Sequence, residues 1–588
     1  MVSLDGWSLD WWIGADDRWH LPAGEIGVRQ QLVQDSPVVE TLVRIPGGDA
    51  VHRTYGIRSP RPVGDEWVVA EVHNPTPVPF AVALVIRPMV AAGVGAVSSI
   101  TVEPTGGGAA GATGRDQPHL VRVDGRPSVL LPRRPARVAV GNRASGDVVD
   151  VVTGGKAGAE LVEASCPDGL ATMAMILPLT HTSTLRAILP VGDVGDGALD
   201  HPSVVPDAAT VASGWDVHRR GPRLEIPEAR ILRAWESARA HLHLAHDGEA
   251  VRRDGHRSAD LDPGATEVIL GAFDMLARPA DVGVVVARWT DRLSGNDPEV
   301  DAMVLTAVSR HWLLHRVDDM LDWMLPEVAA AVERIDKADR RGRLGTVAAR
   351  RRAADGLRLT SELLAAAGQS DAASAVASLA ERVSVALPEP DPFNAVERLL
   401  VASDLAAAGD PAGHAAILRE IGDASATGAW LGPGPGGRII GHDLAATGAL
   451  IAAVRHLVVA ERPGGLAMLP HHPDAWYGGG VEAHEVPTAA GEISYAVRWH
   501  GTRPALLWEL TPHDRRRPVT LTIPGLDPAW SSTEARGETL LGEVEPPSGL
   551  EPVTLVAEHP DIDPEMRRPG SPPEAPSAPD LPDGGSFS

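Results

Sequence analysis

The stretch between residues 310 and 327 holds the densest group of side chains that could do acid–base chemistry. Asp318 and Asp322 are four residues apart there, and Glu327 directly follows Pro326, which we expect to interrupt the helix. Residues at i and i+4 share one side of a helix, so the spacing predicts two facing carboxylates. Repulsion between them would raise the pKa of one, as a general acid requires. An exposed helix face whose acids pair with neighbouring His and Arg residues has the same spacing, and that alternative stays open.

Asp443 is the fourth candidate acid. It follows the glycine-rich stretch 432–437 and begins the last long helical segment. A carboxylate there could act as a base, although Asp is also favoured at the N-cap of a helix. No Lys-Ser/Thr pair follows the glycines, so the stretch does not predict a phosphate-binding loop.

Trp is unusually frequent among the aromatic residues, with 15 Trp against 3 Tyr and 4 Phe. The broad face of Trp suits stacking on a pyranose ring, although Trp also fills cores in a chain rich in small residues. Some of these residues lie close to acids, and others lie in the C-terminal stretch. The candidates for contact with a sugar are Trp12, Trp312, Trp323, Trp476 and His500.

Motifs for a cofactor or a metal are missing from the sequence. Cys166 is the only cysteine, so a cysteine-rich zinc site and an internal disulfide are excluded. His241, His243 and His246 do not share one helical face. There is no His-Glu-x-x-His, no Gly-x-Ser-x-Gly and no dinucleotide fingerprint. We therefore expect no cofactor and no metal.

The charge balance bears on partners and location. With 53 Lys+Arg against 78 Asp+Glu, the formal net charge is -25, which argues against nucleic acid and anionic membranes as partners. The amino terminus has no basic segment followed by an apolar one, and no apolar run has the length of a membrane helix. We expect a cytoplasmic protein, and a homo-oligomer is possible.

Hydrophobic patterning divides the chain into three regions and a tail. Residues 1–222 favour strands, for example 38–45 and 50–57 around a Pro-Gly-Gly-Asp turn, which predict a hairpin. Runs 67–72 and 80–86 repeat this pattern, as in a β-sandwich.

Residues 223–462 have helical spacing and predict about ten helices joined as antiparallel hairpins. Asp297-Pro298-Glu299 and Asp391-Pro392 are typical helix starts. Residues 463–558 return to strands, with a three-stranded meander over 481–510 and later strands at 519–523 and 553–557. The composition of residues 559–588, rich in Pro, predicts a disordered tail.

A resemblance to a known family lies in the C-terminal stretch. It is found in Leu469-Pro470, Trp476-Tyr477-Gly478, Val481-Glu482, Pro487-Thr488, Gly491, Ser494–Gly501 and Arg503–Glu509. Together with the order of the regions, this stretch resembles the six-hairpin glycosidases, the (α/α)6-toroid group that includes glucoamylase-like and amylo-glucosidase-like enzymes. The resemblance implies a multidomain α+β fold with an N-terminal β-sandwich, a central (α/α) toroid of helical hairpins and a small C-terminal β-module.

The same resemblance implies a carbohydrate ligand and general acid/base hydrolysis of a glucan or oligosaccharide. Two departures from the family pattern stand against it. The aromatic–Arg–Asp segment that binds sugar in such enzymes is missing, and the helices number nearer ten than twelve. A catalytically silent toroid that binds a glycan or a protein partner is therefore the alternative function.

Overall fold

The structure, a computed structural model, describes residues 2–547 apart from several internal gaps. The gaps are residues 5, 59–65, 91–92, 106–116, 192–203, 247–249, 255–261, 290–296, 386–390, 392 and 434–438. Only the backbone is described for residues 3, 4, 287–289, 318, 433, 439 and 440. Residues 1–544 form one compact unit and 545–588 another. The predicted tail and the expected strand at 553–557 lie outside the described residues.

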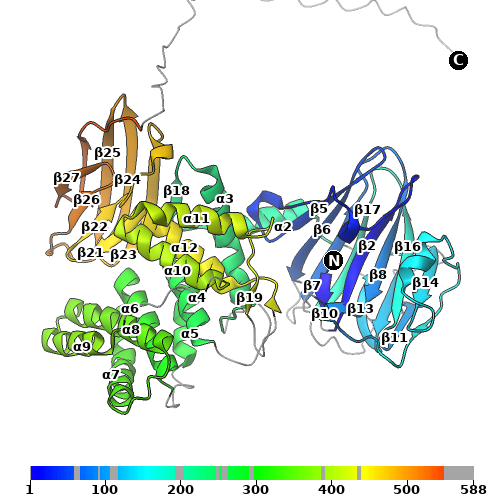
Figure 1. Ribbon diagram of the computed structural model, residues 1–588, viewed down its shortest axis with the longest axis horizontal. Coiled ribbons are helices and arrows are strands. Elements are labelled where there is room, and N and C mark those ends of the chain that lie inside the picture. The colour runs from blue at the N-terminus through cyan, green and yellow to red at the C-terminus, as the bar shows by residue number, and fades with distance from the viewer. Residues whose placement is uncertain are drawn as a thin grey trace, which may run out of the picture. The chain divides into compact units, whose positions relative to one another are not determined.

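The N-terminal region consists of two facing antiparallel sheets (Figure 1). The first contains β1 (Val2–Leu4), β2 (Trp7–Gly14), β3 (Trp19–His20), β8 (Phe80–Arg87), β14 (Arg137–Gly141) and β16 (Thr172–Leu179). The second contains β4 (Arg29–Leu32), β5 (Val39–Ile45), β6 (Gly48–Arg58), β7 (Glu66–His73), β11 (Ser99–Pro104), β12 (His119–Val123), β13 (Arg126–Leu131), β15 (Ala164–Ser165) and β17 (Thr184–Val191). Alternate side chains of the two sheets, such as Leu84 and Val129, meet in one buried core, as a sandwich requires.

Strand pairing confirms the first predicted hairpin and changes the second. β5 pairs with β6 from Val39↔Thr54 to Ile45↔Gly48. β7 and β8 do not pair with each other: β7 lies between β6 and β17, whereas β8 lies between β2 and β16 in the other sheet. The Asn74-Pro75-Thr76-Pro77 turn therefore carries the chain from one sheet to the other. Asn74 is buried and donates to three carbonyl groups, among them that of Val78 at 2.9 Å.

Two smaller helices, α1 (Val148–Thr153) and α2 (Ala208–Gly214), also belong to the N-terminal region, as does a short ribbon of β9 (Met89–Val90) and β10 (Gly93–Val94). The central region follows with ten α-helices among its described residues. They are α3 (Ala229–Leu242), α4 (Pro263–Met275), α5 (Pro279–Trp289), α6 (Pro298–His315), α7 (Asp318–Arg340), α8 (Val347–Ala366), α9 (Ser370–Val383), α10 (Ala395–Ala408), α11 (Pro411–Asp423) and α12 (Leu444–Val458). The predicted number of about ten is confirmed.

We call the even-numbered helices of the central region the inner set, because they contact one another in series and each odd-numbered helix there packs against at least one of them. α4 packs on α6 and α12, α6 packs on α8, and α10 packs on α12. Arg351 of α8 pairs with Asp404 of α10 at 2.9 Å, which links the remaining two neighbours. A helix surrounded by others must be apolar on most sides. Accordingly, α12 buries 13 of its 15 residues, whereas α9 and α10 each bury 5 of their 14. A short β19–β20 ribbon (Gly432–Pro433 and Ile439–Ile440) precedes α12.

The C-terminal strands form two sheets. β18 (Arg223–Glu225), β23 (Val481–Thr488), β24 (Gly491–His500), β25 (Arg503–Pro512) and β28 (Arg536–Leu540) make one, and β21 (Val459–Arg462), β22 (Gly465–Met468), β26 (Thr520–Ile523) and β27 (Asp527–Ser532) make the other. The predicted meander of β23, β24 and β25 is confirmed. These strands and the helices share one continuous hydrophobic core, whereas the sandwich has cores of its own. The β–α–β order of a multidomain α+β protein is thus confirmed.

Three helix boundaries differ from expectation. The stretch 310–327 is not one helix, because α6 ends at His315 and Arg316 takes a left-handed conformation (φ 51°) before α7 begins. α7 continues through Pro326. α10 begins at Ala395 instead of next to Pro392, because Asn394 caps it by accepting from the N–H groups of Val396 and Glu397.

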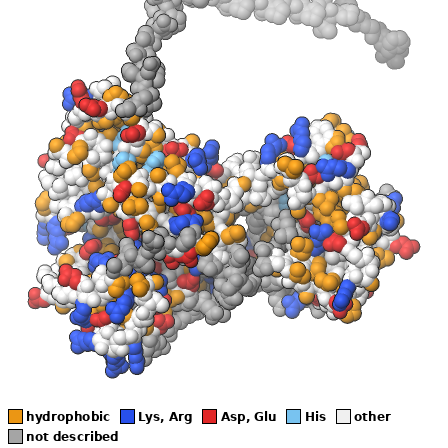
Figure 2. All heavy atoms as spheres, viewed as in Figure 1, with side chains coloured by type: hydrophobic (Ala, Val, Ile, Leu, Met, Phe, Trp, Pro, Cys, Tyr) orange, Lys and Arg blue, Asp and Glu red, His pale blue; other side chains and the backbone are white. Residues whose placement is uncertain are grey.

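Among the described residues, none of the helices combines the length and apolar character needed to cross a membrane. On the face drawn in Figure 2, acidic and basic side chains are interspersed. The acidic excess therefore does not gather into one patch on that face.

Candidate functional site

A polar stripe runs along the otherwise apolar helix α4. Gly264, Glu267, Gly271 and Asp274 follow one another at spacings of three, four and three residues, so they share one side of the helix. Glu267 is partly buried, and its Oε2 atom is buried without a hydrogen-bond partner. A buried carboxyl oxygen without a partner is costly if the group is ionised. The stripe thus places one exceptional carboxyl group among the inner helices.

Two arginines from neighbouring helices lie against the glycines of this stripe. A Cβ atom added to Gly271 would meet Nη1 of Arg310 at 2.2 Å, and one added to Gly264 would meet Nη1 of Arg352 at 3.3 Å. Glycine therefore leaves room for a guanidinium group one turn before and one turn after Glu267. Each glycine costs the helix roughly 1 kcal/mol relative to Ala. The two glycines lower the stability of the helix but make room for the side chains of Arg310 and Arg352.

Carboxylates of α8 and α10 complete what we call the inner charged cluster: Glu267, Arg310, Arg351, Arg352, Asp355 and Asp404. Nη2 of Arg351 lies 2.9 Å from Oδ2 of Asp404, and its Nε lies 3.6 Å from Oδ2 of Asp355. Asp355 also pairs with Arg358, and Arg352 pairs with Glu299 at the start of α6. Ion pairs thus join α8 to α6 and to α10, and the charges of α6 and α8 act on Glu267 of α4.

The carboxyl groups of this cluster differ in how far they are exposed to water. The pKa of Glu267 is raised to about 7, mainly by burial and also by the charge of Asp355, while Arg310 and Arg352 act in the opposite direction. The surrounding protein also raises the pKa of Asp404, although its side chain is 59% exposed. A proton donor and solvent-exposed carboxylates therefore occur in one cluster.

The acids predicted from sequence lie elsewhere. Asp322 is exposed on α7, and Glu327 is partly buried on the same helix; the side chain of Asp318 is not described. Asp443 is 1% exposed, caps α12 by accepting from the N–H of Ala445, and forms a double hydrogen bond with Arg253 at 2.9 and 2.6 Å. α7 packs on α6, α8 and α9, whereas α12 packs on α3, α4 and α10. The structure does not bring these four residues together as a group.

The predicted sugar-binding aromatic residues are also dispersed. Trp12 and Trp476 are 0% exposed and Trp312 is 5% exposed. Arg87 covers the ring of Trp12, and Arg316 lies over Trp312 at 4.0 Å from the ring centre. Trp323 is 42% exposed on α7, and His500 is exposed at the end of β24. Only these last two present a free surface among the five, and their role stays a prediction.

A signal for Glu267 was present in the sequence. The segment Pro-Gly-Ala-Thr-Glu-Val-Ile-Leu-Gly-Ala-Phe-Asp-Met of α4 is apolar around the helix except for Thr266, Glu267 and Asp274. An apolar helix of this kind is buried, and a charged residue on it needs a partner. The partners come from α6 and α8, and sequence spacing alone does not identify them.

Comparison with known proteins gives a likeness in layout only. No family model matches the chain, and no curated protein matches it. A bacterial glucoamylase solved with acarbose matches with 9% identity and a TM-score of 0.39, over 64% of this chain and 60% of its own. A putative kojibiose phosphorylase from the human microbiome matches with 8% identity and a TM-score of 0.44, over 90% of this chain and 88% of its own.

The chain thus spans about 60% of the length of the glucoamylase. Scores of this size carry no argument about the reaction.

Proposed function

We propose that this chain is a carbohydrate-active protein that hydrolyses a glucan or oligosaccharide at the inner charged cluster, with Glu267 as the proton donor and Asp355 as the ionised carboxylate. The observation that carries the proposal is the state of Glu267. It is a carboxyl group with a pKa raised by burial to about 7 and an unpartnered oxygen, close to exposed carboxylates and arginines.

Hydrolysis of a glycosidic bond requires these two kinds of acid. One carboxyl group must be protonated at neutral pH to donate to the leaving oxygen, and the other must be ionised to activate water or to attack the sugar. Burial favours the protonated form of Glu267. Arg351 and Arg358 each form an ion pair with Asp355. The two environments therefore support opposite roles.

The substrate class rests on two features. Arginines and carboxylates of the cluster are suitable hydrogen-bond partners for sugar hydroxyl groups. The resemblance of residues 469–509 to the β-module of six-hairpin glycosidases supports a sugar over other neutral ligands. The identity of the sugar and of the glycosidic linkage is determined by the substrate panel described next.

The test compares two classes of substrate with one variant. A panel of oligosaccharides and aryl glycosides is first assayed with the wild type. Glu267→Gln is then expected to lose about 10²–10⁴-fold in rate on oligosaccharides, whose leaving groups need a proton. It should retain most of its rate on dinitrophenyl glycosides, whose leaving groups need none. A purely structural role for Glu267 would lower both rates equally.

Two controls sharpen this test. Glu333→Gln changes an exposed acid of α7 and should leave both rates unchanged. Asp322→Ala tests the acid predicted from sequence; a loss of activity there, with Glu267→Gln unaffected, would move the site to α7. Glycan binding by the wild type without turnover of any substrate would contradict hydrolysis and support the silent, glycan-binding alternative.

A further inference from the structure

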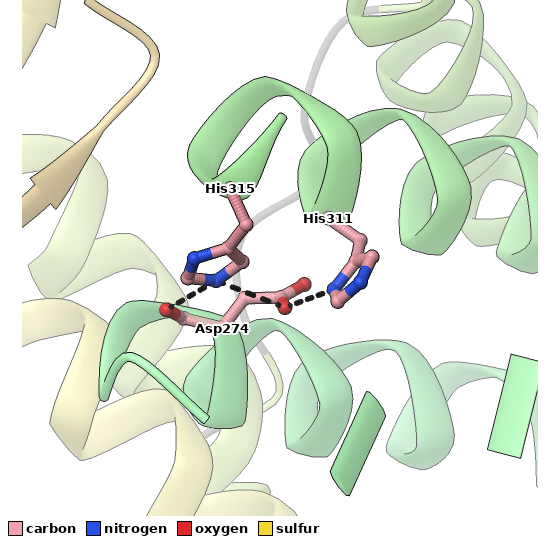
Figure 3. Close-up of side chains that lie close together, drawn as sticks. All are labelled: Asp274, His311 and His315. Carbon is pink, nitrogen blue, oxygen red and sulfur yellow. Dashed lines mark hydrogen bonds and ion pairs between the residues drawn. The ribbon is translucent and has the colours of Figure 1, made fainter. Parts of the chain in front are cut away.

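A second polar group lies where α4 and α6 end, separate from the inner charged cluster. Asp274 is the penultimate residue of α4, and His311 and His315 occupy the last turns of α6 at i and i+4. Figure 3 shows both imidazole rings directed at the Asp274 carboxylate from the neighbouring helix. Nδ1 of His311 lies 2.7 Å from Oδ1 of Asp274, and Nε2 of His315 lies 3.4 Å from the same oxygen. We call these residues the Asp–His cluster.

The Asp–His cluster is almost dry. The side chains of Asp274, His311 and His315 are 0%, 1% and 11% exposed. The second carboxylate oxygen of Asp274, Oδ2, is buried without a hydrogen-bond partner. One imidazole would be enough to hold Asp274 in place. Nε2 of His315 also lies 3.2 Å from the backbone carbonyl oxygen of Asp274, so hydrogen bonding accounts for both imidazoles but leaves the orphaned carboxylate oxygen unexplained.

The electrostatic setting favours a cation at this point. Both α4 and α6 terminate here, and the carboxyl end of a helix carries partial negative charge. Arg316, the residue that follows α6, is directed elsewhere: it stacks on Trp312 and donates to the carbonyl oxygen of Ala489 at 3.1 Å. His513 lies near His315, and its Nε2 lies 3.2 Å from the Thr488 carbonyl oxygen.

We infer that Asp274, His311 and His315 form a binding site for one divalent transition-metal ion, with two imidazole nitrogens and a carboxylate oxygen as ligands. The three ligand atoms all lie within 4.8 Å of one another. Ligand atoms around a tetrahedral zinc ion with bonds of about 2.0–2.1 Å are about 3.3 Å apart. The spacings of 2.7 and 3.4 Å bracket that value.

The ligand set narrows the class of metal. Two His and one carboxylate suit Zn²⁺ and Fe²⁺, whereas Ca²⁺ and Mg²⁺ require oxygen ligands. Three protein ligands leave at least one position for water or another small ligand. The partly exposed edge of His315 is the side from which the ion and that ligand would enter. This site is independent of the hydrolysis proposed above.

The test measures binding of the metal alone to the full chain, produced without a polyhistidine tag and freed of metal with a chelator. Titration with ZnCl₂ in a calorimeter is expected to show one ion per chain. CoCl₂ should give a visible absorption spectrum of imidazole-ligated cobalt that ZnCl₂ then displaces. Asp274→Asn and His315→Gln are each expected to weaken Zn²⁺ binding by about 100-fold or more, beyond the loss typical of outer-sphere changes.

The control is His500→Gln, which changes an exposed histidine on β24 and should bind Zn²⁺ as the wild type does. Circular dichroism shows whether each variant folds; if Asp274→Asn does not, His315→Gln decides, because its side chain lies at the edge of the cluster. The inference is overturned if the wild type binds no stoichiometric Zn²⁺, or if both folded variants bind it as tightly as the wild type.

Discussion

Helices α4 and α6 contribute to both polar groups of the central region, and the two groups differ in how water reaches them. In the inner charged cluster, Asp404 is 59% exposed and arginines balance the acids. In the Asp–His cluster, Asp274 is 0% exposed and only imidazoles contact its carboxylate. Glu267 and Asp274 are seven residues apart on one side of α4. Two turns of a single helix thus separate a carboxyl group surrounded by arginines from one contacted by imidazoles.

Removal of one acid from each cluster should give the largest difference in the free energy of unfolding. Asp274→Ala leaves the buried His311 without its partner and should lower the free energy of unfolding by about 3–5 kcal/mol. Asp404→Ala removes an exposed ion pair and should cost less than about 1 kcal/mol. Chemical unfolding without added metal measures both. Equal losses would show that the two clusters do not differ in burial.

The raised pKa of Glu267 should make the stability of the protein depend on pH. Its pKa is about 7 in the folded protein, against a usual value of 4.5. Between these values the folded state holds a proton that the unfolded chain releases, so this group stabilises fully below about pH 4.5 and its contribution is lost as pH rises through 7. The loss is about 3 kcal/mol. Glu267→Gln has no proton to lose, so its stability relative to the wild type should be higher at pH 8 than at pH 5.

Calorimetric unfolding of both proteins at the two pH values measures this difference. A relative stability that does not change with pH would contradict the raised pKa. In that case Glu267 would be ionised at neutral pH and could not be the proton donor.

A smaller effect is expected at Asp443. Asp443→Asn retains an oxygen that can accept from Ala445 but loses the charge that pairs with Arg253. Charged hydrogen bonds of this kind contribute about 1.5–3 kcal/mol, so the variant should lose about 2 kcal/mol while keeping its activity on any substrate found. An active site at Asp443 would instead show lost turnover with little change in stability.

The smallest change in stability is expected from Gly271→Ala. Ala favours a helix by about 1 kcal/mol, but its Cβ must displace the guanidinium of Arg310. We expect a net change within about 1 kcal/mol and a further rise in the pKa of Glu267, because Arg310 lowers it. Titration followed by carboxyl ¹³C NMR measures this shift. Gly283→Ala on α5 is the matched control, since nothing lies within 4 Å of its added Cβ, and it should leave the pKa of Glu267 unchanged.

Local sequence signals predicted where helices and strands form better than they predicted where each one ends or what it packs against. Asp297-Pro298 begins α6 as expected, because the Asp297 side chain accepts from the N–H of Glu299. The end of α6 carries no Gly or Pro. Arg316 is held in its left-handed conformation by Trp312 and by the carbonyl of Ala489, which lies 173 residues away in sequence. A contact so distant in sequence cannot be predicted from local spacing.

The candidate site was missed for the same reason. The acids at 318, 322 and 327 have suggestive spacing along the chain, but the properties of Glu267 depend on arginines from two other helices. For Asp443, a candidate base, the alternative of an N-cap is confirmed, and that alternative was predictable because capping is a local interaction. The overall order of strands and helices was predictable because hydrophobic periodicity is local as well.

The pairing of β18 with β23 has a consequence for synthesis of the protein. Residues 223–225 precede the first central helix, yet their partners are residues 482–484. The core shared by the helices and the C-terminal sheets extends to Leu541. On the ribosome, the sandwich can close its own core early, whereas the helices must wait with exposed apolar faces until the last strands emerge. We therefore expect nascent chains that end before residue 480 to depend on chaperones, although their N-terminal region is already folded.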